Sequence, residues 1–203
     1  MYRILLPGLI SLLSACTPAV KTVSTPPNEQ QWQQHLQQVS AISQWDISGR
    51  LGVETEQNGG QIDIFWQQQR DDYYDIRMVA PFGGGTHFLS ARPEAVTFTN
   101  GNGQQIIEQN ADQLLARING WSFPVSGMRY WILGMPVPGK TARLISWNEQ
   151  GLLHLMEQDG WRIEIPRYKQ EGDYTLPKKI FLSRPDNDHL SVRMVIRNWG
   201  LAQ

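Results

Sequence analysis

Most of the chain alternates between apolar and polar residues with a period of two. From Trp45 to Glu54 the odd positions are apolar or glycine, and the even positions are polar or glycine. The same alternation recurs in residues 62–67 and 74–78. Successive side chains of a β-strand point to opposite faces of the sheet, so this period is typical of half-buried strands. The pattern predicts three successive antiparallel strands.

The alternation returns in most of the sequence that follows. Turn-forming runs separate its segments, among them Asn100-Gly101-Asn102-Gly103, which is a strong hairpin signal. The further predicted strands cover residues 86–91, a segment around Val96 and Phe98, and residues 104–107, 142–148, 151–157, 161–166, 176–183 and 189–198. Eleven strands in this order favour one large, strongly curved antiparallel sheet.

Three segments change to the helical period. In residues 29–42 the apolar side chains recur every three or four positions, opposite a glutamine-rich face. Asn110 can cap a second helix that ends at Gly120, and a third, short helix begins at Pro124 and stops at Gly134. A closed barrel would leave little room for helices. We therefore expect them to pack on the concave side of an open sheet.

The N-terminal segment has the pattern of an export signal. Arg3 precedes a short apolar run that closes with Leu12-Leu13-Ser14-Ala15-Cys16. The run is too short to span a bilayer, and small residues stand before a cleavage point. Cys16 is the only cysteine, so it has no disulfide partner within the chain. The alternatives are an ordinary secretory signal and a small buried cysteine.

This run resembles the lipobox of bacterial lipoproteins. The resemblance implies that residues 1–15 are a lipoprotein signal peptide and that Cys16 becomes the acylated first residue of the mature protein. Two or more acyl chains anchor a protein stably, at about 0.8 kcal/mol per buried methylene. The next residue is Thr17 and not the aspartate that favours retention in the inner membrane. The implied location is the periplasmic face of the outer membrane.

The remaining sequence divides into a tether and one domain. Residues 16–28 are rich in proline and threonine and have no apolar period, so we expect a lipidated tether. Residues 29–203 suffice for a single domain with a core. The formal net charge of −1 does not suggest a nucleic-acid partner. Beyond the signal no apolar run approaches the roughly 20 residues that a membrane helix needs, so lipid is the expected attachment.

The polar residues form no pattern typical of catalysis. The four histidines, His35, His87, His154 and His189, stand in separate predicted elements without metal-ligand spacing, and we expect them at the surface or at sheet edges. Asp186-Asn187-Asp188 lacks the glycine and the distal glutamate of a calcium loop. The sequence also lacks the nucleophile elbow and the phosphate loop of common enzyme families.

The apolar residues suggest a binding cavity instead. Eight tryptophans, six phenylalanines and six methionines supply a sheet whose inner face could enclose acyl chains. Core packing is still the commoner role at any single position, and a one-residue shift of register would reverse the face. The candidate lining residues are Ile47, Leu51, Ile62, Ile64, Trp66, Ile76, Met78, Val96 and Phe98 from strands, with Leu114, Leu115, Met128 and Trp131 from helices.

One loop also departs from the strand pattern. In Pro81-Phe82-Gly83-Gly84-Gly85 a large aromatic residue stands between proline and three glycines, where a regular strand is unfavourable. We expect Phe82 to project from the sheet. The alternative is that it folds back into the core.

Five motifs together resemble the LolB family, the outer-membrane receptors of the bacterial lipoprotein-sorting pathway. They are Gln31-Trp32-Gln33-Gln34-His35, Phe65-Trp66-Gln67-Gln68, Pro81-Phe82-Gly83, the run from Arg129 to Pro136, and Trp199. The resemblance covers essentially the mature chain and rests on the order of these motifs together with the lipobox. It implies an unclosed antiparallel β-barrel of about eleven strands with an α-helical lid over an apolar cavity.

The resemblance also implies a function and its partners. A LolB receptor takes acylated lipoprotein cargo from a soluble, LolA-like periplasmic carrier and inserts it into the lipid of the outer membrane, without nucleotide hydrolysis. The family loop between the third and fourth strands delivers the cargo through an exposed leucine. Pro81-Phe82-Gly83 matches that loop, with phenylalanine in place of leucine. We expect a monomer with no enzymatic activity and no cofactor.

Three other functions are compatible with the sequence. A soluble carrier of the same pathway would share the fold, but it would need neither Cys16 nor Phe82. A lipid-processing enzyme would need a nucleophile activated by a base, and no serine stands in such a motif. A structural outer-membrane lipoprotein would bind a stable partner and no acyl chain.

Overall fold

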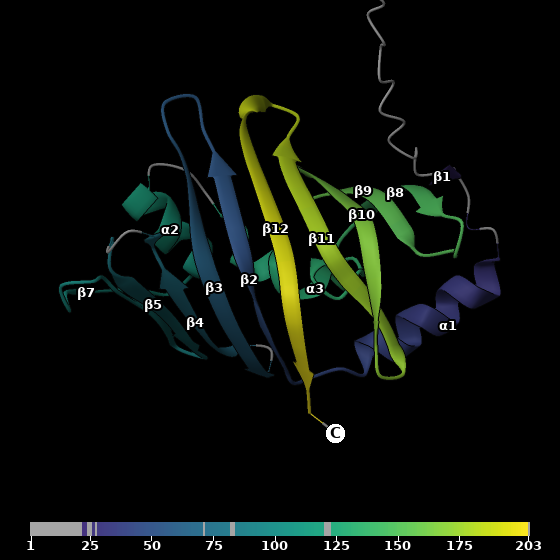
Figure 1. The fold of residues 1–203 in the computed structure, drawn as a ribbon, viewed down its shortest axis with the longest axis horizontal. Coiled ribbons are helices and arrows are strands. Elements are labelled where there is room, and N and C mark those ends of the chain that lie inside the picture. The colour runs from purple at the N-terminus through teal and green to yellow at the C-terminus, as the bar shows by residue number, and fades with distance from the viewer. Residues whose placement is uncertain are drawn as a thin grey trace, which may run out of the picture.

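The computed structural model describes residues 22–23, 26, 28–70, 72–81, 84–119 and 123–202. In this part of the chain, a twisted antiparallel sheet forms one layer and three helices lie against it (Figure 1). The predicted signal peptide, Cys16 and most of the tether lie outside the described residues. Phe82 and Gly83 lie outside them as well.

The strands form two blocks that follow the chain order. The first block contains β2 (Trp45–Glu54), β3 (Gly59–Arg70), β4 (Tyr73–Val79), β5 (Thr86–Arg92), β6 (Ala95–Thr99) and β7 (Gln105–Glu108). The second contains β8 (Ala142–Asn148), β9 (Leu153–Gln158), β10 (Trp161–Glu171), β11 (Tyr174–Arg184) and β12 (Asn187–Leu201). These are the eleven strands that the alternation predicts, with small differences at their ends.

A twelfth strand, β1 (Thr22–Val23), was not predicted and comes from the tether. It pairs with the end of β8, Thr22 opposite Asn148 and Val23 opposite Trp147. The spatial order of the strands is β1-β8-β9-β10-β11-β12-β2-β3-β4-β5-β6-β7. Because the order ends at two different strands, the sheet is not closed, as predicted.

The pairing of β12 with β2 joins the two blocks into one sheet. It extends from Ser191 opposite Glu54 to Leu201 opposite Trp45. The register is irregular between Ile196 and Asn198. A Cβ atom on Gly49 would lie only 2.3 Å from the carbonyl oxygen of Val195, so this position requires glycine. The last strand of the chain thus lies beside the first long one.

The three helices begin where the sequence predicts. In α1 (Glu29–Ser40) the Asn28 side chain accepts a hydrogen bond from the Gln31 amide at 3.2 Å. In α2 (Ala111–Asn119) the Asn110 side chain accepts from the Asp112 and Gln113 amides at 2.8 and 3.1 Å. These are N-caps, which satisfy amides that have no partner within the helix. No helix in the described ranges is long and apolar enough to cross a membrane.

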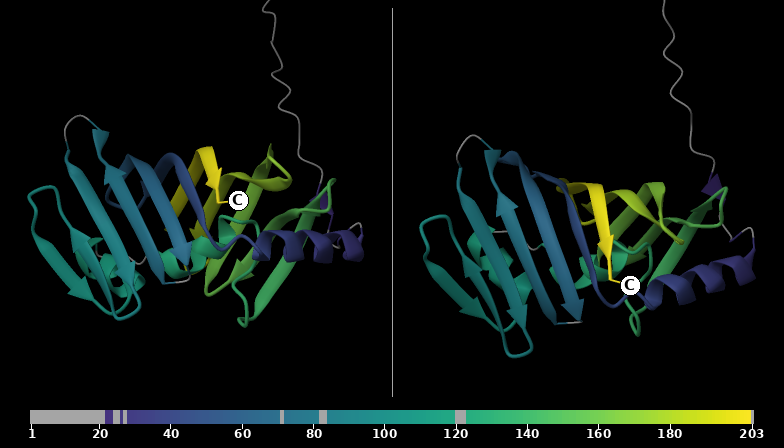
Figure 2. Two further views of the ribbon diagram at one scale, coloured as in Figure 1. Left: turned by 90° about the horizontal axis from the view of Figure 1, so that it is seen from below. Right: turned by 60° about the horizontal axis from the view of Figure 1, so that its bottom comes forward.

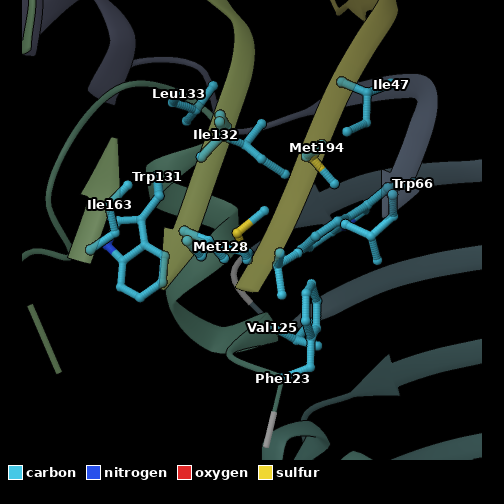
Figure 3. Close-up of a cluster of buried hydrophobic side chains, with 14 of the residues drawn as sticks. Ile47, Trp66, Phe123, Val125, Met128, Trp131, Ile132, Leu133, Ile163 and Met194 are labelled. Atoms are coloured by element: carbon cyan, nitrogen blue, oxygen red, sulfur yellow. The ribbon is translucent and has the colours of Figure 1, made fainter. Parts of the chain in front are cut away.

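The third helix, α3 (Val125–Trp131), is shorter than predicted, because a turn with a left-handed backbone at Gly134 follows it. Together α2 and α3 lie on the concave side of the sheet, and α1 closes the end near β8 (Figure 2). Figure 3 shows side chains of α3 and its flanking residues among those of the facing strands. The core therefore lies between the concave face and the helices.

A buried glutamine attaches α3 to the sheet. Gln158, at the end of β9, is only 3% exposed. Its Oε1 accepts hydrogen bonds from the indole of Trp131 at 2.9 Å and from the amide of Val137 at 2.8 Å. Its Nε2 donates to the carbonyl oxygens of Val137 and Lys140. One polar side chain thus holds both the helix and the turn that follows it.

We expect Gln158→Leu to destabilise the protein by about 3 kcal/mol, because two buried donors lose their acceptor while side-chain volume is nearly kept. Urea unfolding of the mature protein measures this change. The matched control is Gln105→Leu, at an exposed position of β7, which should change stability by at most about 0.5 kcal/mol. Equal effects of the two substitutions would contradict the role of Gln158.

Candidate functional site

The concave apolar cluster unites all the residues that the sequence nominates for a cavity. Eleven of the thirteen candidates are buried, and Ile62 and Met78 are partly buried against the same cluster. The predicted inward face of the strands is therefore correct. Whether these side chains contact acyl chains stays a prediction.

The described side chains pack tightly on this concave side. Met128 and Trp131 of α3 are fully buried between the helix and the strands (Figure 3). The ring of Trp131 lies against Gly127, where a Cβ atom would approach two ring carbons to 2.7 Å. Around α3 the helix therefore lies directly on the strands. The cavity expected from the resemblance, and its opening to a ligand of acyl size, stay predictions.

Aromatic side chains pack against one another in the middle of this core. The ring of Trp45 lies 5.3 Å from that of Trp66 and 5.8 Å from that of Trp199, between ring centroids. The indole of Trp66 donates a hydrogen bond to the buried side chain of Gln68 at 3.1 Å. Tyr74 packs on Trp66, and burial raises the pKa of its phenol, so it stays neutral. The polar groups of this aromatic cluster, those of Trp66, Gln68 and Tyr74, are thus uncharged.

The inner side of α1 carries an unexpected histidine. Trp32, His35 and Val39 are its buried residues, and the ring of Trp32 packs edge-on against Trp147. His35 Nε2 is buried and has no hydrogen-bond partner within the described ranges. The prediction of a surface position was wrong for His35, because it follows Trp32 by three residues and so shares the apolar face of the helix.

The other histidines occupy varied positions. His189 is exposed on β12, as predicted. His87 is partly buried and stacks on Phe98, with ring centroids 5.7 Å apart. His154 is partly buried, with Nδ1 at 3.3 Å from the carbonyl oxygen of Ile165. Within the described ranges, no group of three or more histidine, cysteine, aspartate or glutamate residues is placed to hold a metal ion.

The hairpin between β4 and β5 contains the predicted projecting loop. The Ala80 amide donates to the Gly85 carbonyl at 3.0 Å, and the Gly84 amide donates to the Pro81 carbonyl at 3.1 Å. Gly85 has φ of +94°, a conformation that favours glycine. Pro81 is exposed, and this end of the hairpin lies on the same side of the molecule as β1 (Figure 2). The projection of Phe82 itself stays a prediction.

Comparison with known proteins gives the family. The sequence model of the family described as "Outer membrane lipoprotein LolB" matches residues 43–199. The chain is 35% identical over 201 residues to the outer-membrane lipoprotein LolB of Ectopseudomonas mendocina, covering 98% of this chain and 96% of that protein. The LolB of Pseudomonas fluorescens is also 35% identical, over 95% of this chain and 92% of its own length.

The chain belongs to the LolB family. The fold agrees with this assignment. A LolA superfamily protein from Nitrosomonas europaea has a TM-score of 0.55 at 7% identity, covering 84% of this chain and 93% of that one. A DUF1329 family protein from Desulfovibrio piger has a TM-score of 0.53 at 8% identity, covering 87% and 94%. LolB is a non-enzymatic family, which agrees with the prediction from the polar residues.

The motifs that suggested LolB have mainly structural roles. The Gln31–His35 motif supplies two of the buried residues of α1. In the Phe65–Gln68 motif, Trp66 and Gln68 are buried. The run from Arg129 to Pro136 forms the end of α3 and the turn held by Gln158. Three of the five motifs thus contribute buried residues to the core.

We expect the stability of this protein to fall as the pH drops below about 6.5. Burial lowers the pKa of His35 from its ordinary value of 6.5, so the folded protein keeps this imidazole neutral. The unfolded chain then binds a proton that the folded chain does not, which favours unfolding. Urea unfolding at about pH 7.5 and about pH 5.5 measures the loss. His35→Asn should remove most of it.

The matched control for this pH effect is His189→Asn, which should keep the full pH dependence because His189 is exposed. Paired carboxylates respond at lower pH. Hydrogen bonds from Arg143 and Arg162 help to lower the pKa of Glu157 from 4.5, so its contribution is lost only below that pH. An unchanged pH dependence in His35→Asn would show that α1 does not sense this proton.

Proposed function

We propose that this protein takes acylated lipoproteins from a LolA-like periplasmic carrier and inserts them into the outer membrane, to which Cys16 anchors it. Membership of the LolB family supports a role in lipoprotein localisation. The observation that carries the finer proposal is the concave apolar cluster, a broad hydrophobic sheet face against which helices pack. Among the described residues that are buried, none is an aspartate, glutamate, lysine or arginine. Such a surface suits acyl chains.

Binding would exchange one set of apolar contacts for another. When cargo enters, the apolar side chains of the covering helices leave the sheet face and the acyl chains take their places. Each buried methylene contributes about 0.8 kcal/mol, which offsets the contacts that the helices lose. A preference of about 1.4 kcal/mol at each step gives a tenfold bias towards the next site. No nucleotide is needed for such a downhill transfer.

The anchor would keep the domain close to the membrane. The pairing of Thr22 with Asn148 fixes the chain to the sheet six residues after Cys16. An extended chain spans at most about 3.6 Å per residue, so that edge of the sheet would stay within about 22 Å of the lipidated residue. The β4–β5 hairpin lies on the same side of the molecule (Figure 2). Hairpin and anchor could therefore meet one membrane surface.

We expect the mature, acylated protein in phospholipid vesicles to accept a labelled lipoprotein from a LolA-like carrier. The label should move from the soluble carrier to the vesicles only when the receptor is present, because the apolar face offers the route. Flotation of the vesicles measures this transfer. Equal transfer to vesicles without the receptor, or none with it, would reject the proposed function.

Phe82→Glu should block release into the vesicles and leave uptake of cargo intact, because a charged tip resists entry into lipid. The labelled lipoprotein should then remain bound to the receptor, which co-precipitation detects. Phe82→Leu should keep delivery, since the tip stays apolar.

The matched control is Phe88→Glu, which makes the same change at a residue of β5 that is 45% exposed. It should release cargo normally. Normal release by Phe82→Glu would contradict the role of this loop, whereas failure of both glutamate variants would indicate a general effect of added negative charge.

A further inference from the structure

The end of β8 accepts an extended polypeptide. Thr22 and Val23 of the tether pair there with Asn148 and Trp147. An edge strand presents main-chain amides and carbonyls that can bind another strand, whatever its side chains. In the described ranges β1 covers only these two residues of β8, which continues back to Ala142. The contact is short enough to be exchanged for another.

A pocket of about 430 Å³ lies beside this end of β8. Its lining residues are Gln31, Gln34, His35 and Gln38 from α1, Gln150, Gly151 and Leu152 from the β8–β9 turn, and Thr175 from β11. No member of this lining is an aspartate, glutamate, lysine or arginine. The four glutamine side chains offer both hydrogen-bond donors and acceptors, so the pocket suits an uncharged ligand with groups of both kinds.

One residue of the pocket lining has a buried polar atom without a hydrogen-bond partner in the described part of the chain. His35 is only 8% exposed, and its Nε2 is buried without a hydrogen-bond partner in the described part of the chain. Nearby, the indole nitrogen of Trp147 is buried without one as well. Trp32 packs against both of these rings. A buried polar group without a partner costs about 1–3 kcal/mol, and one of the two residues, His35, lines the pocket.

We propose that the end of β8 and this pocket form a docking site for the peptide segment that follows the acylated cysteine of an incoming lipoprotein. A peptide main chain carries alternating hydrogen-bond donors and acceptors. The glutamine side chains of the lining and the edge of β8 can pair with both kinds of group. A charged lipid headgroup would find no opposite charge in the lining. The receptor's own tether is a segment of the same kind, with one charged residue, Lys21, between Cys16 and Asn28.

This site rests on the proposed function and extends it from the acyl chains to the peptide. One helix connects the two parts, because α1 directs Trp32 and Val39 into the core and Gln31 and Gln38 towards the pocket. Cargo could thus hold its lipid beneath the helix and its peptide beside it. Two linked contacts raise the affinity more than either alone. The receptor's own Thr22–Val23 would leave the strand edge when the cargo segment binds.

Two lipopeptides with the same acylated cysteine test the proposal. One carries an uncharged tail of about ten residues, and the other ends just after the cysteine. Each is loaded on the LolA-like carrier and offered to the mature receptor in phosphatidylethanolamine–phosphatidylglycerol vesicles. The concentration for half-maximal capture should be about tenfold lower for the tailed lipopeptide, as expected for a few added hydrogen bonds.

The double variant Gln31→Ala/Gln38→Ala should remove most of this tenfold advantage and leave capture of the tail-free lipopeptide unchanged. The matched control is Gln30→Ala/Gln37→Ala, which makes the same change on the other flank of α1, where both residues line a different pocket. Alanine favours the helix, so all these variants should keep α1. Equal effects of the two double variants would overturn the pocket assignment.

The shared strand edge has its own test. Thr22→Pro/Val23→Pro removes two main-chain donors from the receptor's tether and should improve capture of the tailed lipopeptide about threefold, because the edge is no longer occupied. Unchanged capture would overturn the exchange at β8. If neither lipopeptide is captured, the proposed function fails. If both are captured equally well, only the peptide site fails.

Discussion

The pairing of β12 with β2 is the contact on which the rest of the structure depends. Without it, the strands would form two smaller sheets, one of β1 and β8–β12 and the other of β2–β7. The pairing extends along most of both strands and requires glycine at position 49, where a Cβ atom would lie 2.3 Å from the carbonyl oxygen of Val195. It creates one concave surface, wide enough to bury three helices and the aromatic cluster around Trp66. The core therefore depends on the continuity of the sheet.

That concave surface forms the core, and in the proposed function the same side chains would contact acyl chains. The helices that cover it are held to different extents. Gln158 makes one hydrogen bond to Trp131 of α3 and three to the turn that follows the helix, and the ring of Trp131 lies close against Gly127. In α1 three side chains are buried and Leu36 packs partly buried against the core, and one of the buried three, His35, lacks a hydrogen-bond partner in the described ranges. Side-chain hydrogen bonds to the sheet thus help to hold α3, whereas apolar packing holds α1.

Much of this architecture could be predicted from the sequence because a half-exposed sheet repeats every two residues. The alternation gave the strands and the inward face of residues such as Ile47 and Ile64. It could not give β1, since two residues have no period. His35 was expected at the surface, because a histidine considered alone is more often exposed than buried. Its position three residues after Trp32 puts it on the apolar face of α1 instead. Apolar composition cannot distinguish a filled core from an open cavity, since the same side chains serve both.

The position of β12 also bears on how the protein is made. β2 ends at Glu54, and β12, which pairs with it, begins only at Asn187. During synthesis, β2 therefore emerges well before the strand that pairs with one of its edges. Pairings between strands so far apart in sequence form slowly, because a long stretch of chain must first be brought together.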